Sequence, residues 1–109
     1  MDKDATGNDP IKVIVDKDLE TLIPGFLQRR REDLEKLREA LQAQDVEVLR
    51  VTGHSMKGTG GGYGFDRLSA LGAAIESSAK GGDLQDIREQ VDLLENYLDH
   101  LQVEFASEP

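Results

Sequence analysis

Apolar side chains recur every three or four residues along most of this 109-residue chain, and this spacing strongly constrains the fold. An α-helix turns about 100° per residue, so the spacing gathers apolar side chains on one face of a helix. The longest stripe lies near the C-terminus and consists of Ile87, Val91, Leu94, Leu98, Leu101 and Phe105. We find no alternation of apolar and polar residues that competes with these helices. The chain is therefore expected to be all-α.

Residues that favour helix ends divide this pattern into segments. An Asp side chain accepts hydrogen bonds from the free amides of a first turn, so we place helix N-caps at Asp16, Asp45, Asp66 and Asp83. Pro24 and Gly25 separate a short helix, ending near Ile23, from a long helix that ends near Ala43. The pair Gly81-Gly82 ends the helix that Asp66 begins. We expect an up-down antiparallel four-helix bundle with an additional short N-terminal helix.

A single bundle accounts for nearly the whole chain, because 109 residues suit one domain with one modest core. We assign residues 16–107 to this domain and residues 1–15 to an N-terminal lead that is partly disordered. Within the lead, the apolar IKVIV segment can lie extended against the domain. The arginine run at positions 29–31 is interpreted as a solvated face, with anion binding as the alternative.

Composition excludes several classes of function. Thirteen Lys and Arg against 22 Asp and Glu give a formal net charge of -9, which repels nucleic acid and anionic lipid. No run of 18 apolar residues is present, and the absence of cysteine suits a reducing cytoplasm. Two histidines on different helices, without clustered carboxylates, do not make a metal site. We expect a cytoplasmic monomer that binds neither metal, nucleic acid nor membrane.

The stretch GHSMKGTGGGYGF, from Gly53 to Phe65, is unusual for the interior of a helical chain. Each glycine in a helix costs about 1 kcal/mol relative to alanine. Five glycines, at positions 53, 58, 60, 61 and 62, therefore indicate either that the helix ends before this segment or that something approaches its backbone closely. Residues 49–65 also contain no Asp or Glu while carrying Arg50 and Lys57, so a dianion would be tolerated here.

A helical projection places His54 roughly 120° from the centre of the apolar face, so its ring faces at least partly outward. Its neighbours within about 60° on the same projection are Arg50, Lys57, Gly58 and Gly61. An imidazole that accepts a phosphoryl group needs an exposed ring nitrogen, nearby positive charge and room for the donor. Lys57 supplies the charge, and the two glycines leave the room.

The motif His54-Ser-Met-Lys57-Gly58, followed by small residues and Gly64, resembles the signature of the histidine-containing phosphotransfer (HPt) domain. The downstream LGAAIESSAKGGD segment is similar to the next helix of that family, and the resemblance covers roughly residues 19–105. It implies a four-helix bundle in which His54 is phosphorylated, Lys57 stabilises the phosphoryl group and Gly58 leaves space beside the ring. The three consecutive glycines at 60–62 depart from the family, which usually keeps one or two small residues there.

The resemblance also implies the partners of the chain. HPt domains carry phosphate between receiver domains of response regulators and hybrid histidine kinases, and the receiver supplies the Mg²⁺ and the carboxylates. The chain then needs no cofactor and, without ATP-binding motifs, acts as a phosphoryl carrier rather than as an independent kinase. Docking contacts are expected at Arg50, Val51 and Gly61, which lie on the side of His54. The alternative is a helical adaptor that docks on a receiver or kinase without being phosphorylated.

Other polar or aromatic residues are interpreted as structural. His100 projects roughly 140° from the apolar stripe of the last helix and lacks a following Lys-Gly pair. Tyr63 and Phe65 are expected to pack the turn after the histidine helix. The KGTGGGYG segment is not a nucleotide-binding loop, because Lys57 precedes the glycines and no strand comes before it.

Overall fold

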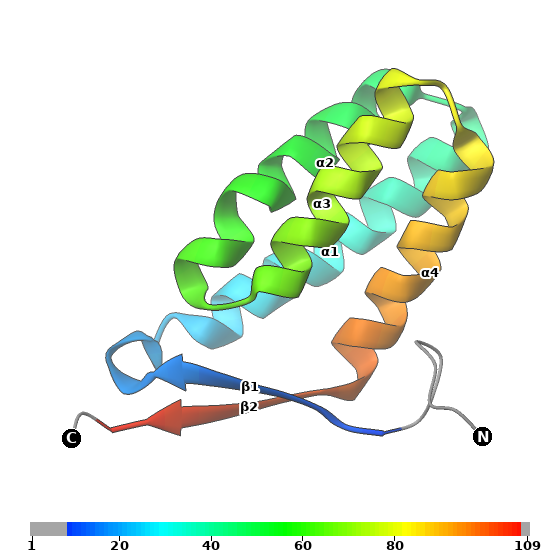
Figure 1. The fold of residues 1–109 in the computed structure, drawn as a ribbon. Coiled ribbons are helices and arrows are strands. Elements are labelled where there is room, and N and C mark those ends of the chain that lie inside the picture. Colours follow the sequence, from blue (N-terminus) through cyan, green and yellow to red (C-terminus); the bar gives the residue numbers. More distant parts are fainter. Residues whose placement is uncertain (1–8, 108–109) are drawn as a thin grey trace.

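The computed structural model describes residues 9–107 and contains four α-helices and two short strands (Figure 1). The helices are α1 (Ile23–Ala43), α2 (Val46–Gly60), α3 (Asp66–Lys80) and α4 (Leu84–His100). Short connections join them, so consecutive helices run in opposite directions around a ring in which α1 also contacts α4. The expectation of a helical bundle is confirmed. No helix within residues 9–107 is both long enough and apolar enough to cross a membrane.

Two of the predicted helix starts are confirmed by side-chain caps. The carboxylate of Asp45 accepts a hydrogen bond from the Val48 amide at 3.2 Å, and that of Asp83 accepts one from the Asp86 amide at 3.0 Å. The predicted cap at Asp66 is wrong by one residue, because Phe65 is the N-cap and Asp66 is the first residue of α3. An acidic side chain is also favourable there, since it faces the positive end of the helix dipole.

The additional N-terminal helix is not present. Asp16 does accept a hydrogen bond from the Asp18 amide at 2.9 Å, but it begins only the 3₁₀ turn η1 (Lys17–Leu19). Pro24 lies in the first turn of α1, where its missing amide hydrogen costs no helical hydrogen bond. Pro24 therefore begins the long helix and does not interrupt an earlier one.

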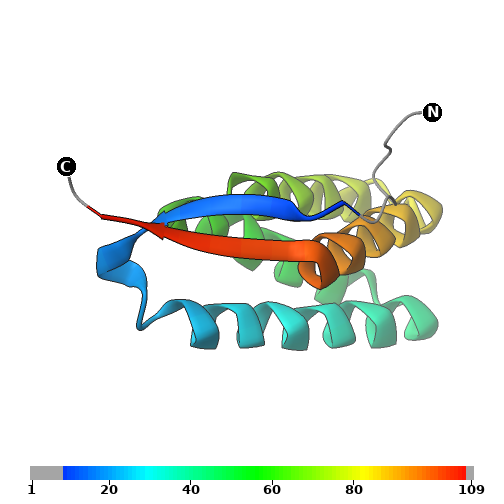
Figure 2. The same ribbon diagram turned by 90° about the horizontal axis from the view of Figure 1, so that it is seen from below.

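The two strands correct the expectation of an all-α fold. β1 (Ile11–Asp16) pairs in parallel with β2 (Leu101–Ala106), and the pair lies beneath the lower end of the bundle (Figures 1 and 2). α4 therefore ends at His100, and the prediction that it runs to Phe105 is wrong. In β2 half-buried and exposed residues alternate, which is the pattern of a strand with one face on a core.

The N-terminal lead divides into two parts. Residues 1–8, most of the segment expected to be partly disordered, lie outside the described residues, so that expectation stays a prediction. The IKVIV segment is extended against the domain as expected, because it forms β1 and its Val15 is buried.

Glycines bring α2 and α3 unusually close together. A Cβ atom on Gly72 would lie 2.5 Å from the Lys57 amide nitrogen, and one on Gly53 would lie 2.8 Å from that of Glu76. Gly60 is equally close to the Ser69 amide, at 2.7 Å. These distances are too short for any side chain, so the glycines fix the spacing and the register of the two helices.

Arg30 contradicts the interpretation of the arginine run as a solvated face. Its side chain is buried, lies over the Phe26 ring at 4.8 Å and donates hydrogen bonds to Asp33 and to Thr59 near the end of α2. The Phe26 ring also stacks on Tyr63 and Phe65, with centroid distances of 4.5 and 5.2 Å. The prediction that these two aromatic residues pack the turn after α2 is confirmed.

Candidate functional site

His54 lies in the middle of α2 on its outward face, and its side chain is 64% exposed. Its Nδ1 atom is 3.0 Å from Oε2 of Glu76 on α3. Within residues 9–107, Nε2 has no hydrogen-bond partner, so this nitrogen is open to solvent. The expectation that the ring faces outward is confirmed.

Glu76 connects His54 to two lysines. Its Oε1 atom is 2.7 Å from Nζ of Lys57, and its Oε2 atom is 3.7 Å from Nζ of Lys80, one turn further along α3. The Glu76 side chain is only 8% exposed, whereas both lysines remain partly open to solvent. One buried carboxylate thus holds the imidazole and pairs with two cations.

The charge of Glu76 follows from these contacts. The hydrogen bond from Lys57, helped by the weaker effect of the one with His54, lowers the pKa of Glu76 from 4.5 to about 2 despite the opposing effect of burial. Glu76 is therefore ionised at neutral pH and only accepts hydrogen bonds. Because Nδ1 of His54 must donate to it, a neutral imidazole carries its proton on Nδ1 and its lone pair on Nε2. The arrangement leaves the lone pair of the neutral ring on the nitrogen that has no hydrogen bond to the described part of the protein.

Sequence reasoning missed Glu76. It treated the surroundings of His54 as free of acid, which is true along α2 but not in space, because α3 brings a carboxylate from 22 residues away. A signal was nevertheless present in the sequence. Glu76 lies on the buried face of α3 beside Gly72, Ile75 and Ala79, and a charged residue on such a face usually has a partner.

Gly58 and two of the expected docking residues, Arg50 and Val51, lie near His54 on α2, whereas the third, Gly61, lies just beyond the end of this helix. A Cβ atom on Gly58 would meet nothing within 4 Å, and Val51 is 49% exposed. Arg50 is engaged by Glu47, whose carboxylate accepts two hydrogen bonds from its guanidinium at 3.1 and 2.6 Å. This contact lowers the pKa of Glu47, and it leaves Lys57 and Lys80 as the cations nearest to the carboxylate of the site.

Ser69 of α3 holds the glycine-rich end of α2. Its hydroxyl accepts a hydrogen bond from the Gly61 amide at 2.8 Å and donates one to the Lys57 carbonyl at 2.9 Å. α2 remains α-helical to Gly60 and continues as the 3₁₀ turn η2 (Gly61–Tyr63). Gly64 then adopts a φ of 89°, a left-handed conformation that favours glycine. The backbone that carries Lys57 is thus anchored to the helix that carries Glu76.

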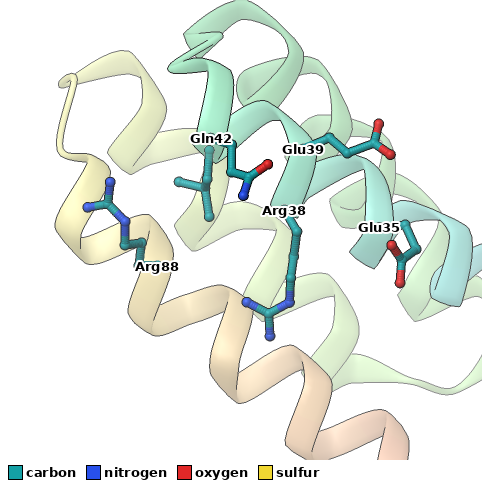
Figure 3. A pocket seen from close by; sticks show the side chains of 6 residues that line it. Glu35, Arg38, Glu39, Gln42 and Arg88 are labelled. Atoms are coloured by element: carbon teal, nitrogen blue, oxygen red, sulfur yellow. The ribbon is translucent and has the colours of Figure 1, made fainter.

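Two other features do not belong to this site. His100 donates a hydrogen bond from Nδ1 to the Asn96 carbonyl at 2.9 Å, within α4. A hollow of about 420 Å³ lies on the seam between α1 and α4, where Arg38 extends from α1 toward α4 and Arg88 lies nearby (Figure 3). This seam is across the bundle from the α2–α3 pair. Within the described range, His, Cys, Asp and Glu side chains form no group of three that could hold a metal ion.

Comparison with known proteins identifies the family. The family model of the Hpt domain matches residues 22–104, which include all four helices and leave out β1. Searches of curated proteins and of solved structures found no significant match. The match covers most of the chain, and the chain therefore belongs to the Hpt domain family, whose members carry out histidine phosphotransfer in two-component phosphorelays.

Proposed function

We propose that His54 is the residue that carries the phosphoryl group. The observation that supports this most directly is the exposed ring, with Nε2 open to solvent and Nδ1 held by ionised Glu76. The Nε2 lone pair attacks the phosphorus of an aspartyl phosphate on a receiver domain. The bond from phosphorus to the aspartate oxygen breaks, and the carboxylate leaves with its electron pair. The reverse reaction on a second receiver returns the phosphoryl group to an aspartate.

Glu76 orients the ring and stabilises its charge during this transfer. When Nε2 bonds to phosphorus, the ring becomes positively charged while its proton stays on Nδ1, 3.0 Å from the carboxylate. An ionised carboxylate at that distance favours the phosphorylated ring. Because Glu76 lies on the neighbouring helix and its side chain is buried, packing fixes the position of its carboxylate more firmly than that of a flexible surface side chain.

Lys57 stabilises the phosphoryl oxygens. Its ammonium group lies 2.7 Å from Glu76 in the unphosphorylated protein, and its side chain is 45% exposed. A lysine is a mobile point charge, so it can contact a phosphoryl group on Nε2 while remaining near the carboxylate. Gly58 keeps the space next to the ring free of side chains.

The proposed partners follow from membership of the Hpt domain family. Hpt domains interact with receiver domains and histidine kinases in phosphorelays, and the receiver would supply Mg²⁺ and the catalytic carboxylates. We propose that residues 16–107 act as a cytoplasmic monomer, with Arg50, Val51 and Gly61 among the contacts. The alternative of an unphosphorylated adaptor is not favoured, because its mark would be a missing or buried histidine and His54 is exposed.

The test is phosphoryl transfer from a panel of phosphorylated receiver domains. We expect a label on the chain that is labile in acid and stable in alkali, present in His100→Gln and absent in His54→Gln. Labelling that persists in His54→Gln, or that is lost only in His100→Gln, would assign the phosphoryl group to another residue. Gel filtration of the unphosphorylated chain checks the monomer.

A further inference from the structure

A second hollow, of about 280 Å³, lies between the start of α1 and the end of α2, beside η2. The residues that line it are Thr21, Leu22, Gly25, Phe26, Arg29, Arg30, Thr59 and Tyr63. Two of them are arginines and none is acidic, although the chain carries 22 acidic and 13 basic residues. The hollow is thus a basic and partly apolar site on a strongly acidic protein.

The lining combines an aromatic surface with a charged rim. Phe26 and Tyr63 stack on each other, and Leu22 is 51% exposed at the edge. Gly25 adds no side chain to the lining, and the space beside it is open, because a Cβ atom there would meet nothing within 4 Å. Arg30 is already held by Asp33 and Thr59, so its charge is partly balanced, whereas Arg29 is exposed. The surface fits an apolar side chain that has a carboxylate beside it.

The hollow and His54 border the exposed face of α2 from opposite sides, because His54 contacts Glu76 on α3 whereas Thr59 accepts a hydrogen bond from Arg30 on α1. Thr59 follows His54 by five residues, which is about 7.5 Å along the helix axis and about 140° around it. Gly58 and Gly62 lie on the way, and a Cβ atom on either would meet nothing within 4 Å. A standard interface covers about 800 Å² per partner, a disc of roughly 16 Å radius. A partner of that size centred on the exposed face of α2 at Gly58 therefore covers both His54 and the hollow.

We propose that the hollow is a second docking point for the receiver domain that exchanges phosphate with His54. It accepts an apolar side chain of the receiver against Phe26 and Tyr63, while Arg29 pairs with a neighbouring carboxylate. The hollow takes no part in the chemistry; it contributes affinity and selects among receivers. This inference rests on the proposed function of His54, because it takes the receiver as the partner that is seated there.

The test uses two variants of the hollow and one matched control. Arg29→Glu reverses the rim charge, and Gly25→Leu fills the hollow with a residue that suits a helix. Arg88→Glu makes the same change of net charge, from -9 to -11, beside the hollow between α1 and α4 (Figure 3). The dissociation constant of an unphosphorylated receiver and the rate of transfer to His54 are measured for each variant.

We expect Arg29→Glu to weaken receiver binding about three- to tenfold. The affinity of this variant should also fall less steeply with added salt than that of the unaltered chain. Gly25→Leu should weaken binding by about tenfold or more, because it removes the space for the anchoring side chain. Arg88→Glu should change binding by less than about twofold. Both hollow variants should keep the melting temperature of the unaltered chain or exceed it.

Labelling by phosphoramidate, a small phosphoryl donor, separates this inference from the proposed function. Phosphoramidate should label His54 equally in the unaltered chain and in both hollow variants, since it needs no docking surface. If neither phosphoramidate nor any phosphorylated receiver labels His54, the proposed function fails. If receivers label His54 but bind both hollow variants as tightly as the unaltered chain, the docking point is refuted. Equal weakening in Arg88→Glu and Arg29→Glu would also refute it, because the effect would then come from net charge.

Discussion

Replacing Gly58 with leucine should make the protein more stable and less active at the same time. Gly58 lies in the last turn of α2, and a Cβ atom there would meet nothing within 4 Å, so the new side chain enters solvent. Leucine favours a helix over glycine by up to about 1 kcal/mol. A gain of that size raises the melting temperature of a domain of this length by about 4–8 °C.

The same side chain would stand one turn from His54 on its exposed side and would obstruct an incoming receiver. We expect the rate of transfer from a phosphorylated receiver to fall by about tenfold or more, because small misplacements of the reacting atoms are costly. Labelling by phosphoramidate should change much less. Thermal melts and single-turnover transfer measured on Gly58→Leu provide both numbers.

A second glycine supplies the control. A Cβ atom on Gly72 would lie 2.5 Å from the Lys57 amide nitrogen, so Gly72→Ala must push α2 and α3 apart and should cost about 1–3 kcal/mol. The reasoning is refuted if Gly58→Leu transfers phosphate at the original rate, since the glycine would then not serve access. A lower melting temperature for Gly58→Leu would show that its side chain does not enter open space.

Three further predictions concern the site and its scaffold. Lys57→Ala should slow transfer or shorten the lifetime of phosphohistidine without unfolding the domain; unchanged transfer and hydrolysis rates would leave Lys57 as an ordinary surface residue. Glu76→Gln should slow transfer and allow the other tautomer of His54, which ¹⁵N chemical shifts of the ring would detect. Because folding lowers the pKa of Glu76 from 4.5 to about 2, its contribution to stability is present above about pH 4.5 and is lost as the pH falls toward 2. Urea titrations should therefore show a difference between Glu76→Gln and the unaltered chain at neutral pH that vanishes near pH 2. Asp83→Ala should remove the N-cap of α4, cost about 1 kcal/mol and leave transfer unchanged.

The glycines of α2 show how a single pattern can contain two structural roles. The sequence presents five glycines within ten residues as one unusual feature. In the structure Gly53 and Gly60 lie against the backbone of α3, whereas Gly58 and Gly62 face open space. Close packing explains the first pair, and access to His54 is proposed for Gly58. Only the position of a neighbouring helix distinguishes them, because each glycine has the same local preference.

The end of α4 shows the limit of a local pattern. Leu98, Leu101 and Phe105 fit a helical stripe, but residues 101–106 also alternate as a strand does, so the expectation that no alternation competes with the helices is wrong here. The choice between them depends on β1, which pairs with β2 from some ninety residues earlier in the chain. Strand pairing between such distant segments is a tertiary interaction, so no window of sequence around Leu101 contains the deciding information.

The sequence by itself determined the four helices, two of their caps and the common exposed face of His54, Lys57 and Gly58. All of these follow from local spacing, because residues three or four positions apart on one helix are neighbours in any fold that keeps the helix. Only the tertiary structure decided that Glu76 faces His54. That contact requires the register of α3 against α2, which depends on how closely their backbones approach at Gly53 and Gly72. Packing between helices sets this register, and the periodicity of each helix alone does not contain it.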